Sequence, residues 1–367
     1  VLSVLGAVVL IQSSHMVSLL LGMELMGVAL YAMIAFPEKG ELPLEGAIKY
    51  LVLSACASAM LLYGFALIYA ATGSLSYLGI GAGAAEAYVQ NPMLIMAGTA
   101  MVLAGIGFKL SVAPFHMWTP DVYEGAPTPV TGFLATVSKG AVFVALTRFY
   151  IDGNLHQYSG LNTALVVLAI ASMLIGNWLA LRQENIKRLL AYSSIAHFGY
   201  LLIVLIALSY MDVQLVSQSI TFYLTAYLVT TLAAFAVVST IAGEDVKRQD
   251  ISAFEGLFWY RPLEASALTV AMLSLAGIPL TAGFMAKFFV ITVGIQSDLW
   301  VLLGVLVLGS AVGIYYYLRV IFAMSKSSQG GEQTANNLEK ILAVALIVSV
   351  LLLGSWPQPF IAYAGGL

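Results

Sequence analysis

The sequence predicts an all-α polytopic membrane protein, and three features support this prediction. First, 61% of the 367 residues are hydrophobic and only 9% are charged, whereas soluble domains are about 45–50% apolar and about 25% charged. Second, the apolar residues form about eleven segments, most of them long enough to cross or partly cross a hydrocarbon core of about 30 Å. Third, the charges between these segments favour one side of the membrane.

The segments are expected to be helices. All but the first are too long for a transmembrane β-strand of about 9–11 residues, and only helices and closed barrels satisfy every backbone polar group in lipid. The predicted segments are residues 1–12, 16–36, 44–72, 91–118, 128–150, 161–181, 188–209, 214–242, 263–296, 299–322 and 339–356. Because Val1 opens inside an apolar run, we expect the natural chain to begin upstream, with further spans.

The basic residues predict the orientation in the membrane. If the side reached after the second segment is called face b, only Arg148 lies on the opposite face. The ten Lys and Arg on face b are Lys39, Arg182, Lys187, Arg188, Lys247, Arg248, Arg261, Arg319, Lys326 and Lys340. The positive-inside rule therefore makes face b cytoplasmic, including the loops at 182–188, 243–262 and 325–338.

The order of the segments predicts an internal repeat. Residues 1–150 and 151–325 would form two five-helix units, inverted relative to each other, and 326–367 would form a C-terminal helix and tail. The fourth member of each unit is broken by a proline, Pro114 or Pro279. A proline alone is more often only a kink, but broken helices at matching positions of inverted halves indicate a transport site near the midplane.

Three lysines are the main candidate site residues. Lys109, Lys139 and Lys287 fall well inside apolar segments, where a charge costs roughly 2.5–3.5 kcal/mol on insertion scales. Burial favours the neutral form of lysine, so a buried lysine can accept and release a proton, which arginine cannot do. We interpret them as proton carriers. Lys49 lies only about a turn and a half inside face b, where snorkelling to the headgroups explains it equally well.

One carboxylate and two histidines complete the set. Glu24 could form an ion pair with Lys109, either as a switch in proton transfer or as a structural link between two helices. His197 near mid-span and His116, two turns after Lys109, are candidate relays, since histidine titrates near neutrality. The alternative for each is a satisfied core histidine. Asp121, in a face b loop, is expected to be structural and to cap a short helical turn.

The sequence also predicts what this chain lacks. It contains no Gly-rich loop after a strand, no H-E-x-x-H motif and no cysteine cluster. Its single cysteine, Cys56, cannot hold a metal or an iron–sulfur cluster alone and is expected to be a small core residue. We therefore expect no metal, cofactor or redox centre in this chain. The net charge of -3 does not indicate a nucleic-acid partner.

The motifs that carry these residues resemble a known family. The run FKLSVAPFHMWTPDVYEGAPTPVTGFLATVSKGAVF is similar to the antiporter-like subunit N of proton-pumping NADH–quinone oxidoreductase, respiratory complex I. Its counterparts are subunit 2 of the mitochondrial complex and the B-type membrane protein of the chloroplast complex. GMEL, EGAIKYLVLSA, NIKRLLAYSSIAHFGY, MLSLAGIPLTAGFMAKFFV and YYYLRV agree as well. The resemblance covers essentially the whole chain.

The resemblance implies a fold of fourteen helices with two inverted five-helix repeats, of which the eleven segments would be helices four to fourteen. It places the family's proton-transfer residues on Glu24, Lys49, Lys109, Lys139, His197 and Lys287. It implies proton translocation driven by redox chemistry in other subunits, which would hold flavin, iron–sulfur clusters and quinone. The expected partners are membrane and peripheral subunits of complex I, including the other antiporter-like subunits, in a bacterial inner membrane or an organellar inner or thylakoid membrane.

Two other functions stay open from the sequence. The chain could be a subunit of a cation/proton antiporter of the same superfamily, because that family shares the fold and the lysines. It could also be a passive scaffold next to a neighbouring quinone site, although lysines at mid-span argue against this. Whether the chain co-purifies with flavin and iron–sulfur subunits distinguishes these alternatives.

Overall fold

The computed structural model describes residues 1–36, 41–242, 249–327 and 337–364, and these parts contain helices without a β-strand. The helices of the first half are α1 (Leu2–Ile11), α2 (Met16–Ile34), α3 (Glu41–Thr72), α4 (Tyr77–Gln90), α5 (Pro92–Leu110), α6 (Trp118–Gly125), α7 (Thr128–Phe133), the π-helical turn Leu134–Ser138 and α8 (Lys139–Asp152). The second half contains α9 (Ser159–Ala180), α10 (Ile186–Ala207), α11 (Val213–Ala242), α12 (Leu257–Tyr260), α13 (Pro262–Ala276), α14 (Ala282–Gln296), α15 (Trp300–Ser325), α16 (Asn337–Ser355) and α17 (Gln358–Ala364), with short 3₁₀ turns at Leu155–Gln157 and Ile251–Phe254.

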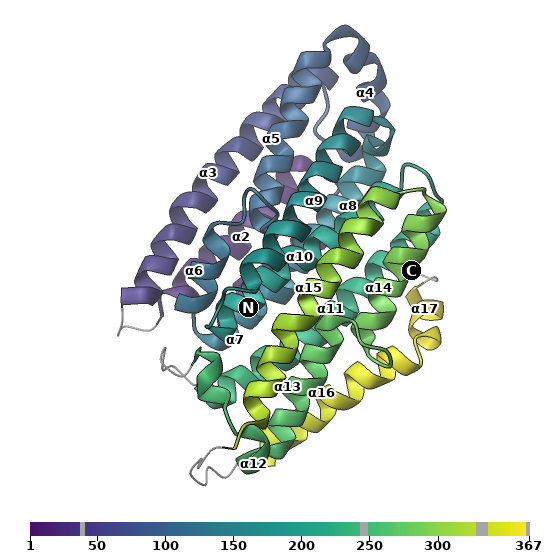
Figure 1. The fold of residues 1–367 in the computed structure, drawn as a ribbon. Helices are drawn as coiled ribbons and strands as arrows, with labels where there is room; N and C mark the ends of the chain where they lie inside the picture. Colours follow the sequence, from purple (N-terminus) through teal and green to yellow (C-terminus); the bar gives the residue numbers. More distant parts are fainter. Residues whose placement is uncertain (37–40, 243–248, 328–336, 365–367) are drawn as a thin grey trace.

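Every predicted segment corresponds to a helix or a broken helix. Eight helices of the described residues are long and apolar enough to cross a membrane, and α1, α13 and α14 are shorter apolar helices. The long helices lie side by side, roughly parallel or antiparallel (Figure 1). The protein is thus an all-α, multi-pass membrane protein, as predicted. The sequence did not predict α4, which follows α3 through a turn capped by Ser76, whose hydroxyl accepts from the Gly79 N–H at 3.1 Å.

The two broken helices end alike. α5 is followed by Ser111 and α13 by Gly277, both in the left-handed region, with φ of 62° and 86°. In each, the next residue donates its N–H to the carbonyl five positions earlier, at 3.0 Å, which is the closing bond of a Schellman motif. Pro114 and Pro279 follow these turns. The predicted breaks at both prolines are confirmed, although the left-handed residues, not the prolines, end the helices.

The breaks run in opposite senses through the molecule. In Figure 1 the chain descends from α5 to α6, whereas it ascends from α13 to α14. This is the relation expected of inverted units. The predicted unit boundaries at 150 and 325 stay a prediction.

Serine side chains satisfy backbone N–H groups at both breaks. The Ser172 hydroxyl on α9 accepts from the Ala113 N–H at 2.9 Å, and the Ser274 hydroxyl on α13 accepts from the Gly283 N–H at 2.9 Å. Irregular backbone at membrane depth is tolerated only where such partners exist. The folded structure therefore stabilises both breaks through specific hydrogen bonds.

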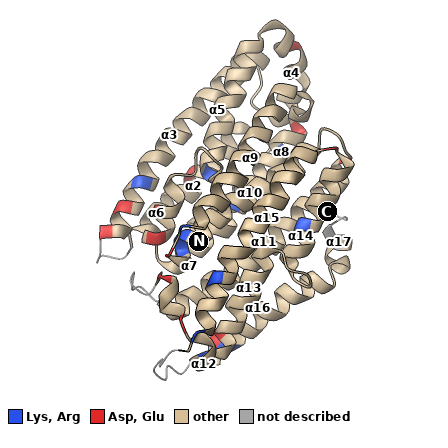
Figure 2. Cartoon of the chain, in the orientation of Figure 1, with Lys and Arg blue, Asp and Glu red and all other residues tan. Residues whose placement is uncertain are grey.

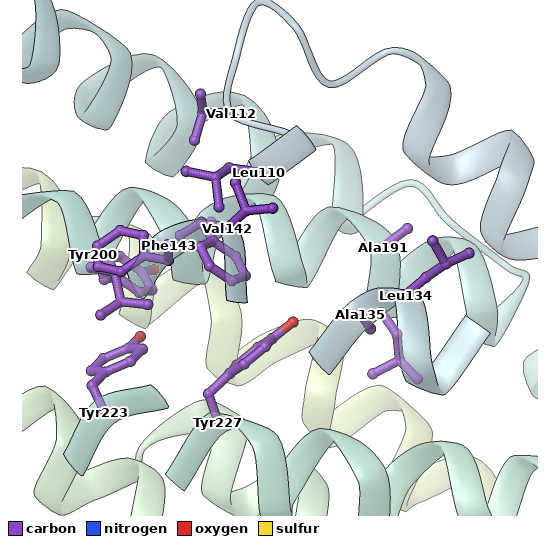
Figure 3. Close-up of a cluster of buried hydrophobic side chains, with 14 of the residues drawn as sticks. Leu110, Val112, Leu134, Ala135, Val142, Phe143, Ala191, Tyr200, Tyr223 and Tyr227 are labelled. Carbon is purple, nitrogen blue, oxygen red and sulfur yellow. The ribbon is translucent and has the colours of Figure 1, made fainter. Parts of the chain in front are cut away.

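The most enclosed helix is α10. Over the most apolar stretch of α10, 94% of the residues are buried inside the protein. The corresponding share in the other candidate membrane-spanning helices is 33–72%. Helix α10 begins at Asn185, whose side chain accepts from the backbone N–H groups of Lys187 and Arg188. It packs against α9, α6, α14 and α11. Figure 3 shows Tyr200 of α10 close to Tyr223, which rises from α11, in the buried cluster between these helices.

Candidate functional site

Helix α10 carries one polar group per turn along its buried side. Ser194, His197 and Tyr200 follow at spacings of three residues, so they share one face over about 9 Å of helix. All three are buried. Two of the predicted lysines lie against this face, one near each end of the row.

Lys139 contacts the first group of the row. It is 1% exposed, and its Nζ donates to the Ser194 hydroxyl at 2.6 Å. The ammonium also lies 5.3 Å from the ring centroid of Tyr123 and 5.5 Å from that of Phe198. The π-helical turn Leu134–Ser138 immediately precedes it within the span. Such turns are rare and occur frequently at functional sites.

Lys287 contacts the last group of the row. Its Nζ lies 5.4 Å from the Tyr200 ring centroid and donates at 2.9 Å to the carbonyl of Ala276, the last residue of α13. A helix leaves its final carbonyls without intrahelical partners and carries partial negative charge there. The break in α13 therefore supplies the neutral acceptor for this ammonium. Gly277 leaves room for it, because a Cβ there would lie 3.2 Å from Nζ.

His197 lies between the two lysines. Its Nδ1 is 2.8 Å from the hydroxyl of Tyr223, and its Nε2 is 3.4 Å from that of Tyr317 on α15. Tyr317 also hydrogen-bonds Ser193, the neighbour of Ser194 on α10. Four side chains from three helices thus form a connected network at mid-span. The sequence singled out His197 but not its tyrosine partners, which lie on α11 and α15, far away along the chain.

Lys109 occupies a separate position near α2 and α3. It lies in the last turn of α5, is 3% exposed, and its Nζ donates to the Ser54 hydroxyl of α3 at 2.7 Å. The ammonium lies over Gly27 of α2, where an added Cβ would be 3.4 Å from it. Its ring neighbour is Tyr50, whose centroid is 5.2 Å away.

Glu24 does not form the expected direct ion pair with Lys109. Instead, the Ser58 hydroxyl of α3 donates to the Glu24 carboxylate, while Ser54, one turn away, accepts from Lys109. Two serines of α3 thus stand between the charges. The carboxylate is nevertheless one turn of α2 from Gly27, over which the ammonium lies. The two charges are neighbours without sharing a hydrogen bond.

Lys49 lies in a charged cluster at the end of the molecule that carries face b. Its Nζ contacts Asp121 at 2.7 Å and Glu45 at 2.6 Å, and its side chain is 40% exposed. Arg188 contacts both Asp121 and Glu124 at 2.8 Å. Figure 2 shows basic and acidic segments close together on the lower part of α3 and near α6, on the left side of the view. The structure therefore does not bring Lys49 into the buried row.

Asp121 is a structural residue, as expected, but through ion pairs, because it makes no helix cap. Partial burial would raise the pKa of its carboxyl, yet the hydrogen bonds and charges of Lys49 and Arg188 outweigh this and hold the pKa below its usual value. Lys187 corrects a second expectation. It is not a loop charge but fully buried, and donates to the carbonyls of Glu124 and Ala126 at 2.9 and 2.6 Å, at the end of α6.

His116 and Cys56 lie outside the row on α10. His116 is buried in the first break, beside Tyr192, and its Nδ1 has no hydrogen-bond partner in the described chain. Cys56 is exposed on α3 and is not a core residue. Lys39, Lys247 and Arg248 lie outside the described residues. Within those residues no group of three or more His, Cys, Asp or Glu could hold a metal ion.

Helices broken at matching positions around a buried row of lysine, histidine and tyrosine define the class of antiporter-like membrane proteins. The comparisons agree. Residues 13–313 match the family model for the transmembrane region of NADH:quinone oxidoreductase and Mrp antiporters. NADH-quinone oxidoreductase subunit N of Methylococcus capsulatus is 46% identical over 366 residues, which cover all of this chain and 74% of that protein. The chain therefore belongs to the subunit N family of NADH-quinone oxidoreductase.

Solved structures place the fold in the same superfamily. A chain of respiratory complex I from Thermus thermophilus, solved with bound aureothin, is 37% identical, with a TM-score of 0.85 over 98% of this chain and 78% of that one. A chain of an archaeal membrane-bound sulfane sulfur reductase is 28% identical, with a TM-score of 0.88, over 100% and 74% of the two chains. A chain of the Mrp complex from Dietzia is 21% identical, with a TM-score of 0.86, over 99% and 75%, and shows a shared fold alone.

Proposed function

We propose that this chain translocates protons across the membrane as a subunit of an NADH–quinone oxidoreductase. The observation that carries the proposal is the row of Ser194, His197 and Tyr200 on α10, which has Lys139 at its first member and Lys287 at its last. Each buried lysine costs roughly 2.5–3.5 kcal/mol on insertion scales. Proton transfer is a function that accounts for two such costly residues against one helix face.

The proton reaches Lys139 from face b. Support comes from four buried hydroxyls that have no hydrogen-bond partner in the described chain, those of Tyr123, Thr128, Tyr227 and Thr231. Tyr123 and Thr128 flank the connection from α6 to α7, at the face b end, and Tyr123 also lies against the ammonium of Lys139. Buried hydroxyls of this kind can bind water, and a chain of water and hydroxyls conducts protons. From Lys139 the proton passes by His197 to Lys287 and leaves on the opposite side.

Glu24 and Lys109 act as the switch that couples this movement to the rest of the complex. With both charged, each stabilises the other across Ser54 and Ser58. A shift of α2 or α3 that separates them favours neutral Lys109 and thereby changes the proton affinity of Lys139. Each charged group contacts a neutral serine and not the other charge. Separating Glu24 from Lys109 therefore does not require a direct ion pair to be broken. Lys49 and His116 stay candidates for proton transfer at the face b side.

The energy for transport comes from other subunits. Flavin, iron–sulfur clusters and quinone are bound there, and this chain holds no redox centre. Its partners are the other membrane and peripheral subunits of complex I, including the other antiporter-like subunits. The 46% identity to a bacterial subunit N favours the bacterial inner membrane over an organellar one, and favours this function over a cation/proton antiporter subunit. The buried lysines disfavour a passive scaffold.

The decisive experiment replaces Lys139. Lys139→Met keeps the apolar stem but cannot bind a proton, and Lys139→Arg keeps the charge but cannot release it at physiological pH. If Lys139 carries protons, both complexes assemble and both lose most NADH-driven proton uptake into inverted vesicles. The rate of NADH oxidation should fall together with proton uptake. The matched control is Lys340→Met, since Lys340 is exposed.

A structural role gives the opposite pattern. The arginine variant would then pump normally, and the methionine variant would reduce the amount of assembled complex on a native gel. Normal pumping by Lys139→Arg removes Lys139 from the proton path.

A further inference from the structure

A cavity of about 530 Å³ lies on the outer side of α15, at the face b end of the molecule. Its volume is within the range of about 300–1,000 Å³ typical of small-molecule sites. One wall is the stripe of α15 from Tyr315 to Lys326, and the other is formed by Glu184 and the segment Asp250–Glu255. A backbone hydrogen bond of 2.8 Å from Ile251 to Glu184 fixes the second wall.

The α15 wall of the cavity carries both aromatic and basic residues, with Arg319 about one turn before Phe322 and Lys326 about one turn after it. Tyr315 and Phe322, each 65% exposed, lie on the α15 stripe, which spans about 16 Å from Tyr315 to Lys326. Lys326 is at the face b end of this stripe, and Trp259 beside it donates its indole N–H to the Lys326 carbonyl at 3.2 Å. Aromatic residues next to basic ones mark the depth of the lipid headgroups.

The charges that line the cavity have both signs. Lys326 pairs with Glu255 at 2.6 Å, and both side chains are well exposed. Arg319 donates its terminal nitrogens to the carbonyls of Leu181 and Gln183, but its Nε has no partner in the described chain. The carboxylates of Glu184 and Asp250 take part in no ion pair among the described residues.

We propose that this cavity binds a phospholipid whose headgroup carries a primary ammonium, namely phosphatidylethanolamine. The phosphate lies at Arg319 and Lys326, the ammonium at Glu184 and Asp250, and the acyl chains follow the aromatic stripe into the bilayer. Three carboxylates against two cations disfavour an anionic lipid. A choline headgroup has no N–H to donate to the carboxylates, so phosphatidylcholine should bind more weakly.

The test uses the whole complex in nanodiscs that contain phosphatidylglycerol with either phosphatidylethanolamine or phosphatidylcholine. Native mass spectrometry measures the lipid that stays bound when this chain is released. We expect phosphatidylethanolamine to be retained, and its retention to fall about tenfold in the double variant Glu184→Gln and Asp250→Asn, which loses charged acceptors for the ammonium. The control, Asp298→Asn, changes an acid on the opposite face and should retain the lipid.

A photoreactive benzoylphenylalanine in place of Ser252 identifies the occupant directly. Crosslinks to lipid support the proposal, whereas crosslinks to a polypeptide of another subunit show a protein interface and overturn it. Equal retention of the two zwitterionic lipids, or equal retention by the double variant and the unaltered chain, also overturns it. Neither experiment depends on proton pumping.

Discussion

The three lysines of the candidate site each donate to a neutral oxygen, as does the buried Lys187 at the face b end. Lys109 and Lys139 contact serine hydroxyls, and Lys287 contacts a backbone carbonyl. In contrast, Lys49 and Arg188 at the face b end contact carboxylates. A lysine in a tight buried ion pair cannot lose its proton without leaving an uncompensated anion. A neutral partner imposes no such penalty, which suits a site that alternates between two protonation states.

The first prediction at this scale concerns Glu24. Glu24→Gln removes the negative charge near Lys109 but keeps the acceptor for the Ser58 hydroxyl. Lys109 should then lose its charge more readily, and we expect a large loss of NADH-driven proton uptake with the complex still assembled. Glu86→Gln, at an exposed glutamate of α4, is the control. Normal uptake by Glu24→Gln would reduce the pair to a structural role.

The sequence identified the ionisable residues of the site but not their partners. Lysine or glutamate in an apolar segment is visible because it is costly there. Ser54, Ser58 and Ser194 are small and common in membrane helices, so nothing in their own segments marks them. For the same reason, the sequence did not show that Glu24 and Lys109 lack a direct ion pair. Opposite charges on two segments suggest contact, but only the packing of α3 between them determines which atoms meet.

At the scale of elements, α10 is the centre of the site. Its sequence SSIAHFGY places Ser194, His197 and Tyr200 at helical spacing, so this row was a signal available in the sequence. Of this row, only His197 was predicted as a site residue. The sequence does not show that both Lys139 and Lys287 lie against this one helix, because these contacts join residues that are 55 and 87 positions apart along the chain.

The second prediction tests the row on α10. His197→Gln keeps side-chain hydrogen bonding to Tyr223 but cannot bind a proton at neutral pH. We expect proton uptake to fall by about 10²-fold or more, since a positioned proton donor and acceptor contributes roughly 10²–10⁴-fold to a transfer step. Tyr210→Phe, at an exposed residue beyond the end of α10, is the control. Unchanged uptake per NADH in the glutamine variant would exclude His197 as a relay.

The third prediction concerns the ion-pair cluster that joins α3, α6 and α10. Asp121→Asn removes contacts to Lys49 and Arg188, and because all three side chains are partly exposed we expect a loss of only about 1 kcal/mol. The pKa of Asp121 is held below its usual value, so its contribution is complete above the unfolded value of roughly 4 and disappears as the pH falls through the lower, folded value.

Thermal dissociation of the purified complex measures this effect. The midpoint of the variant should lie below that of the unaltered complex by a constant amount from pH 8 to pH 5, and the gap should narrow only in more acid solution. A gap that grows as the pH falls would contradict the assignment.

At the scale of the whole molecule, the hydrophobic segments were predictable because each helix must satisfy its backbone alone in lipid. The elements that the sequence missed are those that depend on neighbours. Helix α4 is short, and 77–90 is rich in glycine and alanine, so it has no membrane-spanning signal. Lys187 was counted as a loop charge because NIKR begins a segment, but α10 starts at Ile186 and α6 covers the lysine.

The burial of Lys187 also decides how the orientation is tested. The ten-to-one distribution of Lys and Arg predicts that the connection from α9 to α10 is cytoplasmic, but a cysteine at 187 would be hidden from label. Arg182 is exposed in the same connection, and Gln90, the last residue of α4, is exposed at the opposite end. In a Cys56→Ala background, a membrane-impermeant maleimide should label Arg182→Cys only in inverted vesicles and Gln90→Cys only in spheroplasts. The reverse pattern would invert the whole topology, and with it the direction in which the proposed path from Lys139 to Lys287 runs.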